Sequence, residues 1–396
     1  MSPARIGILG AGAAGTAAAK ILQAASPKMQ IDLFTRTGEQ PFNRTLVNKG
    51  IAIGLLTPAQ ATLPAPGATL VCDTVRGVDP RTRQVQPASG ETRGYDGIIL
   101  ATGSRPRTLG EDVLGRDEAL AAGRLTTLHS PADAAGIRDR LGELPGSARV
   151  LILGGGLLAA ETASLLSTAG HDIALISRST LPGCSAFGEH ISGELLDLHQ
   201  AHGATYLGRT IQAVRTHPDH ITIVLDNGHR VEGDLAIIAH GTLPAAPSPW
   251  NGPDGVPVDD RLRLREAPGQ RIYAAGGVAS HDHPGLGSYR VDHWDDAAAQ
   301  GTHAARTLLH DHGLGEDPGA YRPASTFTSS IHGHTFAGAG HPSPRTRART
   351  VSTDPALIVH EHDEIPVAVT GLDAVPLVHQ WAPRLHHPHE TTTPPE

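Results

Sequence analysis

The sequence predicts an α/β fold with two parallel sheets, because a glycine-rich loop twice separates an apolar strand from a helix. The first loop, residues 10–15 (GAGAAG), follows the apolar run 6–9 and precedes the Ala-rich segment 16–25. The second, residues 154–161 (GGGLLAAE), follows the apolar run 150–153. In such loops the first glycine makes the turn, the second admits a pyrophosphate, and the third position lets helix and strand pack closely. We therefore expect two three-layer, Rossmann-like dinucleotide-binding domains.

The composition of the chain predicts a globular protein. The chain has 396 residues, of which 39% are hydrophobic and 18% charged, enough for two or three globular domains. A net charge of −8 gives no reason to expect nucleic acid as a partner. No apolar run is long enough to predict a membrane span. A strand entered by Ile6 leaves no room for a signal peptide, and Cys72 and Cys184 form no close pair, so we expect a cytoplasmic protein.

Further elements follow from apolar runs and turn signals. Ser130 before Pro131 predicts a helix start, and Asp226-Asn227-Gly228 predicts a hairpin turn. The last stretch, 324–396, is poor in strand pattern, and its tail from 386 onward is expected to be disordered. Strands are expected within 31–34, 71–85, 95–104, 173–176, 211–235, 235–241 and 272–277, and helices at 186–203 and 291–310.

The ends of the second strands carry no acid. In dinucleotide-binding folds an acidic residue usually follows this strand and accepts the ribose hydroxyls. Here Thr35 and Arg36 stand in the first half, and Ser177 and Arg178 in the second. A guanidinium beside hydroxyls suits a 2′-phosphate, so the second site favours NADPH, with NADH as the alternative.

Seven segments, in this order and spacing, resemble the pyridine nucleotide–disulfide oxidoreductase superfamily, and within it the ferredoxin-reductase and rubredoxin-reductase branch. The resemblance covers roughly residues 4–310. Its order and spacing are more specific than any single motif. The segments are GAGAAG (10–15), FNRTLVNK (42–49), ILATGSRP (99–106), GGGLLAAE (154–161), IIAHGTLP (237–244), IYAAGGVAS (272–280) and VDHWDDAAAQG (291–301).

The resemblance implies an architecture and an activity. It implies an FAD-binding domain made of 1–113 and 241–322, an NAD(P)H-binding domain at 114–240, and a small α+β C-terminal interface domain at 323–396 with a disordered tail. Hydride would pass from NAD(P)H to the flavin of FAD, and electrons onward to a ferredoxin-like protein, a quinone or a small molecule. Whether the chain forms a homodimer is left open.

The resemblance also implies site residues. Lys49 would pair with Glu161 near the flavin, where a cation favours the reduced, anionic flavin. His332 and His334 replace the family's aromatic cover and become candidate acid/base groups. The FAD positions are Gly10, Gly12, Ala13, Ala14, Gly15, Thr35, Arg36, Arg44, Lys49, Ala101, Thr102, Gly103, Gly276, Gly277 and Trp294. The NAD(P)H positions are Gly154, Gly156, Leu157, Leu158, Glu161, Ser177, Arg178 and Gly241.

One departure bears on how firmly FAD is held. The family has an aspartate that contacts the flavin where this chain has Gly277, and the ribose acid is also missing at Thr35. Each lost charged hydrogen bond weakens binding by about 1.5–3 kcal/mol. Two alternatives therefore stay open: a loosely held flavin, as in a flavin reductase or diverted biosynthetic chemistry, and a non-catalytic nucleotide-binding protein. Retention of Lys49 and Glu161 argues against the second.

Cysteines and histidines suggest neither a dithiol nor a metal. No cysteine pair lies on segment 42–49 or just after it, which disfavours the disulfide-reductase branches. Metal sites need three or four convergent ligands, whereas the histidines here come as two pairs on loops and one group in the tail. No metal is therefore expected. These histidines are His281 with His283, His332 with His334, and His386, His387 and His389.

Overall fold

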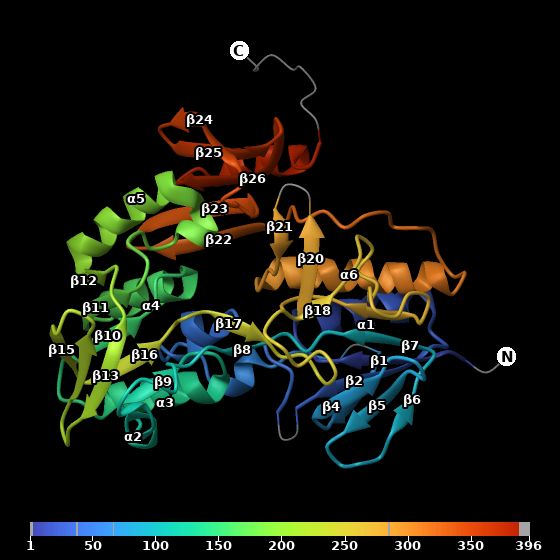
Figure 1. Ribbon diagram of the computed structural model, residues 1–396, viewed down its shortest axis with the longest axis horizontal. Coiled ribbons are helices and arrows are strands. Elements are labelled where there is room, and N and C mark those ends of the chain that lie inside the picture. Colours follow the sequence, from blue (N-terminus) through green and yellow to red (C-terminus); the bar gives the residue numbers. More distant parts are fainter. Residues whose placement is uncertain (1–2, 37–38, 66, 284–285, 388–396) are drawn as a thin grey trace. The chain divides into compact units, whose positions relative to one another are not determined.

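The computed structural model describes residues 3–36, 39–65, 67–283 and 286–387, which form two compact units (Figure 1). Unit 1 comprises residues 1–44, 62–105 and 242–325, and unit 2 comprises 45–61, 106–241 and 326–396. The division into three domains stays a prediction, and of the tail only residues 386 and 387 lie within the described residues. No helix of the described chain is both long and apolar enough to span a bilayer.

Unit 1 is built on a five-stranded parallel sheet in the order β19-β7-β1-β2-β3. Its sheet strands are β1 (Arg5–Leu9), β2 (Gln30–Thr35), β3 (Thr69–Cys72), β7 (Gly97–Leu100) and β19 (Ile272–Ala274). Its helices are α1 (Ala13–Ala25) and α6 (Trp294–Asp311). Smaller strands are β4 (Val75–Asp79), β5 (Gln84–Pro87), β6 (Arg93–Gly94), β8 (Ser104–Pro106), β17 (Thr242–Pro244), β18 (Val256–Pro257), β20 (Ala279–His283) and β21 (Gly287–Tyr289).

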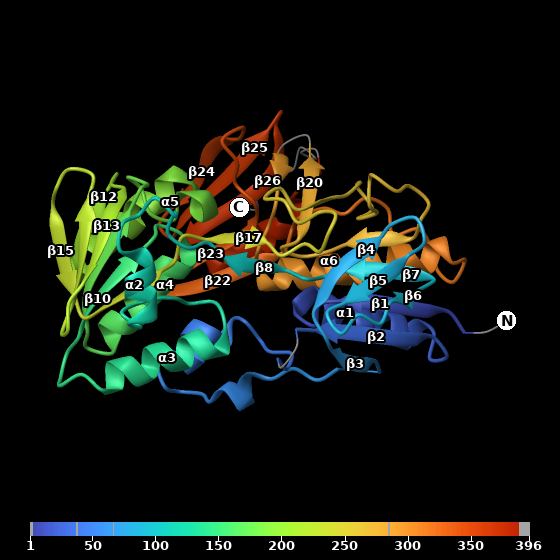
Figure 2. The same ribbon diagram turned by 60° about the horizontal axis from the view of Figure 1, so that its bottom comes forward.

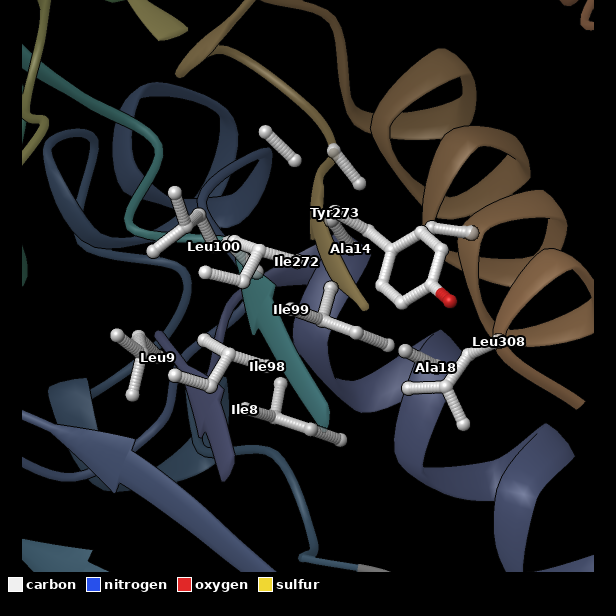
Figure 3. Packing of buried hydrophobic residues seen from close by; sticks show 14 of the residues in the cluster. Ile8, Leu9, Ala14, Ala18, Ile98, Ile99, Leu100, Ile272, Tyr273 and Leu308 are labelled. Atoms are coloured by element: carbon white, nitrogen blue, oxygen red, sulfur yellow. The ribbon is translucent and has the colours of Figure 1, made fainter. Parts of the chain in front are cut away.

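Small residues let α1 and α6 pack closely over this sheet. A Cβ on Gly301 of α6 would lie 2.0 Å from the carbonyl oxygen of Ala14 in α1, so only glycine permits this crossing. Figure 3 shows the apolar side chains of β1, β7 and β19 gathered in the core next to these helices. Tyr273 is fully buried, and its hydroxyl donates to Asp311 at 2.8 Å. The helices therefore hold the ends of the strands in fixed positions.

Unit 2 repeats the parallel sheet in the order β12-β11-β10-β16-β9 and packs a three-stranded antiparallel sheet against it (Figure 2). The parallel strands are β9 (Leu125–Thr127), β10 (Arg149–Leu153), β11 (Asp172–Ser177), β12 (Ala204–Leu207) and β16 (Leu235–Ile238). The antiparallel strands are β13 (Ile211–Thr216), β14 (Ile221–Leu225) and β15 (Arg230–Gly233). Helical elements are η1 (Val47–Ile51), η2 (Pro58–Ala61), α2 (Arg116–Ala121), α3 (Pro131–Gly142), α4 (Leu157–Thr168) and α5 (Cys184–His202).

The expectation of few strands after residue 324 was wrong. Five antiparallel strands form a sheet in the order β22-β23-β26-β25-β24, and Phe336 and Ile358 pack from it against Phe187 of α5. Strands such as HTFAGAG lack the alternating β-branched pattern, so tertiary packing decides their structure. The elements are β22 (Thr326–Ile331), β23 (His334–Gly340), β24 (Arg347–Thr353), β25 (Ala356–His362), β26 (Ile365–Leu372), α7 (Val375–Trp381) and η3 (Ala382–Arg384).

Buried histidines join this sheet to α5. His199 is 4% exposed, and its Nδ1 lies 3.0 Å from Nε2 of His332, whose ring stacks on His202. His360 is also 4% exposed and bonds the hydroxyl of Thr370 at 3.0 Å. Burial, and to a smaller extent the neighbouring imidazoles, lowers the pKa of His199 to about 4. Burial alone lowers the pKa of His360 to about 4. These histidines are therefore neutral in the folded protein at neutral pH.

Acid should therefore destabilise the protein between pH 6.5 and 4. The folded-state pKa lies below the unfolded value, so the stabilisation is complete above pH 6.5 and is lost as the pH falls toward 4. Each such histidine contributes at most about 3 kcal/mol. We expect His199→Gln to flatten the decline in the urea unfolding midpoint between pH 7 and 5. The control His190→Gln changes an exposed histidine of α5 and should leave the decline intact; equal slopes for both variants and the wild type would contradict this account.

Candidate functional site

The first glycine loop leaves space only at its second glycine. Gly10 has φ +117°, and a Cβ there would lie 2.1 Å from the carbonyl oxygen of Ala101. A Cβ on Gly15 would lie 1.8 Å from the carbonyl oxygen of Gly10. In contrast, a Cβ on Gly12 would meet no described atom within 4 Å. Packing of the fold therefore explains the first and third glycines, and the open space at Gly12 is where a ligand can approach the backbone.

The second glycine loop repeats this geometry. Gly154 has φ +149°, and a Cβ there would lie 2.2 Å from the carbonyl oxygen of Ala239. Gly156 again faces open space among the described atoms, and Ala159 stands at the third position, fully buried. Gly12 and Gly156 are the N-cap residues of α1 and α4, and neither helix has a side-chain cap among the described residues or an acid in its first turn. Both helix N-termini can therefore receive an anion on their backbone amides.

Other predicted positions line the same sheet edges. In unit 1, Ala101, Thr102 and Gly103 follow β7, and the Thr102 hydroxyl is buried with no hydrogen-bond partner among the described residues. Ala13 and Ala14 are buried in the first turn of α1, which keeps this edge free of bulky side chains. An unpartnered hydroxyl beside an open glycine loop fits a polar ligand such as a dinucleotide. In unit 2, Leu157 and Leu158 form the first turn of α4, and Gly241 follows β16 with φ +81°.

The strand-end residues differ between the two units. In unit 1, Arg36 pairs with Glu39 at 3.5 Å, next to Thr35 at the end of β2. In unit 2, the Ser177 hydroxyl accepts from the amide of Ser179 at 3.0 Å and is therefore engaged within the chain. Arg178 is exposed and makes no hydrogen bond or ion pair with any described residue. Arg178 is thus the strand-end group that is available to an anionic ligand.

Glu161 is the centre of a buried polar cluster in unit 2. It is 6% exposed, and its Oε1 lies 2.8 Å from Nζ of Lys49 and accepts from the Ser329 hydroxyl at 2.6 Å. Its Oε2 accepts from Nδ2 of Asn48 at 3.0 Å. The pairing of Lys49 with Glu161 is present, although its contact with a flavin stays a prediction. Asn48 and Ser329 were missed, because neither residue type nor spacing marks a partner so distant in sequence.

A π-helical turn places the lysine of this cluster. Val47–Ile51 forms the turn η1, with Asn48 buried and Lys49 reaching Glu161 from a side chain that is 41% exposed. Such turns are rare and often occur at functional sites. The two successive residues therefore bind both carboxylate oxygens of Glu161, while the Lys49 side chain stays partly exposed.

His332 and His334 lie apart from the contacts of Glu161. The amide of His332 donates to the Ser164 hydroxyl at 2.7 Å, and its ring contacts His199 and His202. His334 Nδ1 lies 2.8 Å from Oδ2 of Asp373. These contacts suit a role in holding the C-terminal sheet, and the acid/base role predicted for both histidines stays a prediction.

The remaining unit 1 positions surround the turn after β19. The amide of Gly276 donates to Oε1 of Gln300 at 2.7 Å, and Gly277 follows it. Arg44 donates to the Ser104 hydroxyl at 2.8 Å, and Trp294 is the first residue of α6.

Metal-binding clusters and disulfides are absent from the described residues. This part of the chain contains no group of three or more histidine, cysteine or acidic side chains arranged to hold a metal ion. Cys72 is exposed and Cys184 partly buried, and both are free thiols.

The chain is similar in sequence and fold to several known reductases. Terpredoxin reductase of Pseudomonas sp. is 30% identical over 247 residues, which span 60% of this chain and 58% of that protein. Rubredoxin-NAD(+) reductase of Pseudomonas putida is 26% identical over 355 residues, covering 84% of this chain and 86% of that protein. A crystal structure of a covalent putidaredoxin reductase–putidaredoxin complex has the same fold, with a TM-score of 0.82 at 20% identity, covering 97% of this chain and 93% of that chain.

The family follows from a match over most of the chain. Residues 4–301 match the family model described as pyridine nucleotide-disulphide oxidoreductase, and this range contains both glycine loops, Lys49 and Glu161. The chain therefore belongs to the pyridine nucleotide-disulphide oxidoreductase family.

Proposed function

We propose that this protein is an FAD-dependent NAD(P)H oxidoreductase that delivers electrons to a small redox protein. The observation that carries the proposal is the repeated loop. In each parallel sheet one strand leads into a glycine loop whose second glycine, Gly12 or Gly156, faces open space. Two such loops provide for two dinucleotides in one chain. A protein that only bound one nucleotide would need one.

The first loop would hold FAD and the second NAD(P)H. The helix N-termini at Gly12 and Gly156 would each receive a pyrophosphate. When bound, the flavin supplies the chemistry of accepting a hydride from nicotinamide and passing electrons on singly. Thr102 offers its unpartnered hydroxyl on the FAD side, and Arg178 offers its guanidinium on the NAD(P)H side.

Lys49 and Glu161 would tune the bound flavin. Glu161 receives hydrogen bonds from Asn48 and Ser329, so the carboxylate is held in one orientation and in turn fixes the ammonium of Lys49. A fixed cation beside the flavin stabilises negative charge as it develops, without reorganisation at the moment of transfer. The ammonium is 2.8 Å from Oε1, and the lysine side chain is 41% exposed, so we expect it to reach a ligand while it stays paired.

The electron acceptor is proposed from the relatives. The names of terpredoxin reductase and rubredoxin-NAD(+) reductase each contain the name of a redox protein. We propose the same class of partner for this chain. A quinone or small-molecule acceptor is the alternative. The cytoplasmic location and a homodimer stay predictions from the sequence.

The purified protein should be yellow, and anaerobic NADPH should bleach its flavin absorption. One equivalent of NADPH per FAD should remove most of the visible absorption band of the oxidised flavin, because hydride transfer delivers two electrons. The measurement is an anaerobic titration followed by visible absorption, with NADP⁺ as the control addition. A protein that stays colourless after incubation with FAD would contradict the proposal, and so would a flavin that NADPH and NADH both leave oxidised. A protein that is colourless as purified but reduces added flavin would favour the loosely held alternative.

Arg178 should determine the preference for NADPH. Arg178→Ala should raise KM for NADPH by about 10- to 100-fold and leave KM for NADH unchanged, because a charged contact to the 2′-phosphate is lost. Steady-state reduction of a ferricyanide acceptor with each coenzyme measures this. Arg230→Ala, a change of an exposed arginine on β15, serves as the control. Equal effects of Arg178→Ala on both coenzymes would remove the 2′-phosphate assignment.

A further inference from the structure

Asp292 occupies the space that a side chain on residue 277 would need. A Cβ on Gly277 would lie 2.5 Å from Oδ1 of Asp292 and 3.1 Å from its Cγ. Gly277 does not adopt a positive φ, so its backbone conformation would accept any residue. A side chain at position 277 would therefore have to displace the carboxylate of Asp292 from its observed place.

A network of donors surrounds this carboxylate. The Ser104 hydroxyl donates to Oδ2 at 2.7 Å, and Nη1 of Arg44 lies 3.5 Å from Oδ1. Arg290 donates to the carbonyl oxygens of Gly277 at 2.7 Å and Thr242 at 2.8 Å and so fixes the neighbouring turn. Burial raises the pKa of Asp292, but Arg44, hydrogen bonds from Ser104 and Thr242, and Arg290 outweigh it and leave the pKa below its ordinary value. The group is a carboxylate at neutral pH.

The carboxylate lies at the sheet edge where the first glycine loop opens. Ser104 follows β7 and Gly277 follows β19, so both come from the carboxyl ends of parallel strands of unit 1. Ligands of open α/β sheets bind at this edge. The side chain of Asp292 is 24% exposed, although donors surround its carboxylate. The carboxylate is therefore not sealed from a ligand.

The chemistry of a carboxylate limits what it can bind there. It has about four lone-pair positions and no proton to donate, so its partner must be a donor. The pyrophosphate of a dinucleotide is an anion and would be repelled. Hydroxyl groups remain, and FAD carries a chain of them, the ribityl group, between its pyrophosphate and its ring system. A hydrogen bond from such a hydroxyl to an ionised acceptor is of the strong class.

We propose that Asp292 accepts a hydrogen bond from the ribityl chain of FAD and thereby supplies, from the segment just before α6, the carboxylate that residue 277 lacks. The proposal rests on the proposed function, because it requires FAD at the first loop. Gly277 and Asp292 then act as a pair: the glycine makes the space, and the aspartate fills it with the binding group.

The test is FAD affinity of the full chain after its flavin has been removed. Asp292→Asn keeps the shape and removes the charge, and should raise the Kd for FAD, measured by quenching of flavin fluorescence, by about 10- to 100-fold. Asp295→Asn removes the same charge from an exposed residue in the first turn of α6 and should leave the Kd unchanged. ADP lacks the ribityl chain, so its Kd, measured by calorimetry, should be the same in both variants and the wild type.

Each outcome separates this inference from the proposed function. Wild-type affinity for FAD in Asp292→Asn would overturn the inference and leave the proposed function intact. Loss of ADP and FAD binding together in this variant would show a merely structural role and would also overturn it. A wild-type chain that binds neither ligand would overturn both proposals. Gly277→Ala gives a second route, because its Cβ displaces the carboxylate while Asp292 remains; unchanged FAD affinity in that variant would likewise overturn the inference.

Discussion

The structure depends on one constraint: a phosphate can reach the amides of a helix N-terminus only if the preceding loop carries no side chain in its path. Unit 1 meets the constraint at Gly12 and unit 2 at Gly156, each facing open space among the described atoms. The glycines on either side of Gly12 have a different cause, since backbone oxygens lie within about 2 Å of any Cβ there. The same loop thus combines close packing of strand and helix with an accessible backbone, and the chain does this twice.

Charge is placed around these loops by elements that come from elsewhere in the sequence. Glu161 lies on the helix that follows the second loop, yet Asn48, Lys49 and Ser329 reach it from η1 and β22. In unit 1, Asp292 stands beside Gly277. A carboxylate with several donors keeps its ionised form, and a cation fixed by such a carboxylate is oriented before any ligand arrives. We infer that the fold prepares the charges around both loops before either dinucleotide binds.

The sequence predicted those elements of the fold that local residue patterns determine. Both loops, the parallel strands beside them and the helix start at Ser130 follow from glycine spacing, apolar runs and capping chemistry, and they are confirmed. The resemblance implied an α+β fold for the C-terminal region, and its sheet is present, but the residue pattern did not predict the individual strands. These strands are rich in Gly, Ala, Thr and His and are stabilised by packing against α5. Asp292 was not foreseen either, since nothing in the spacing of residues 277 and 292 shows that their side-chain spaces coincide. From the sequence alone, glycine at position 277 therefore indicated only the loss of a contact to the flavin.

The most direct test of the account is a crystal structure of the protein with both FAD and NADP⁺ bound. The account predicts the FAD pyrophosphate over Gly12, with a ribityl hydroxyl within hydrogen-bond distance of Asp292, and the NADP⁺ pyrophosphate over Gly156, with its 2′-phosphate beside Arg178. Density for only one dinucleotide at saturating concentrations of both, or FAD at the second loop, would contradict the claim that each glycine loop serves its own cofactor.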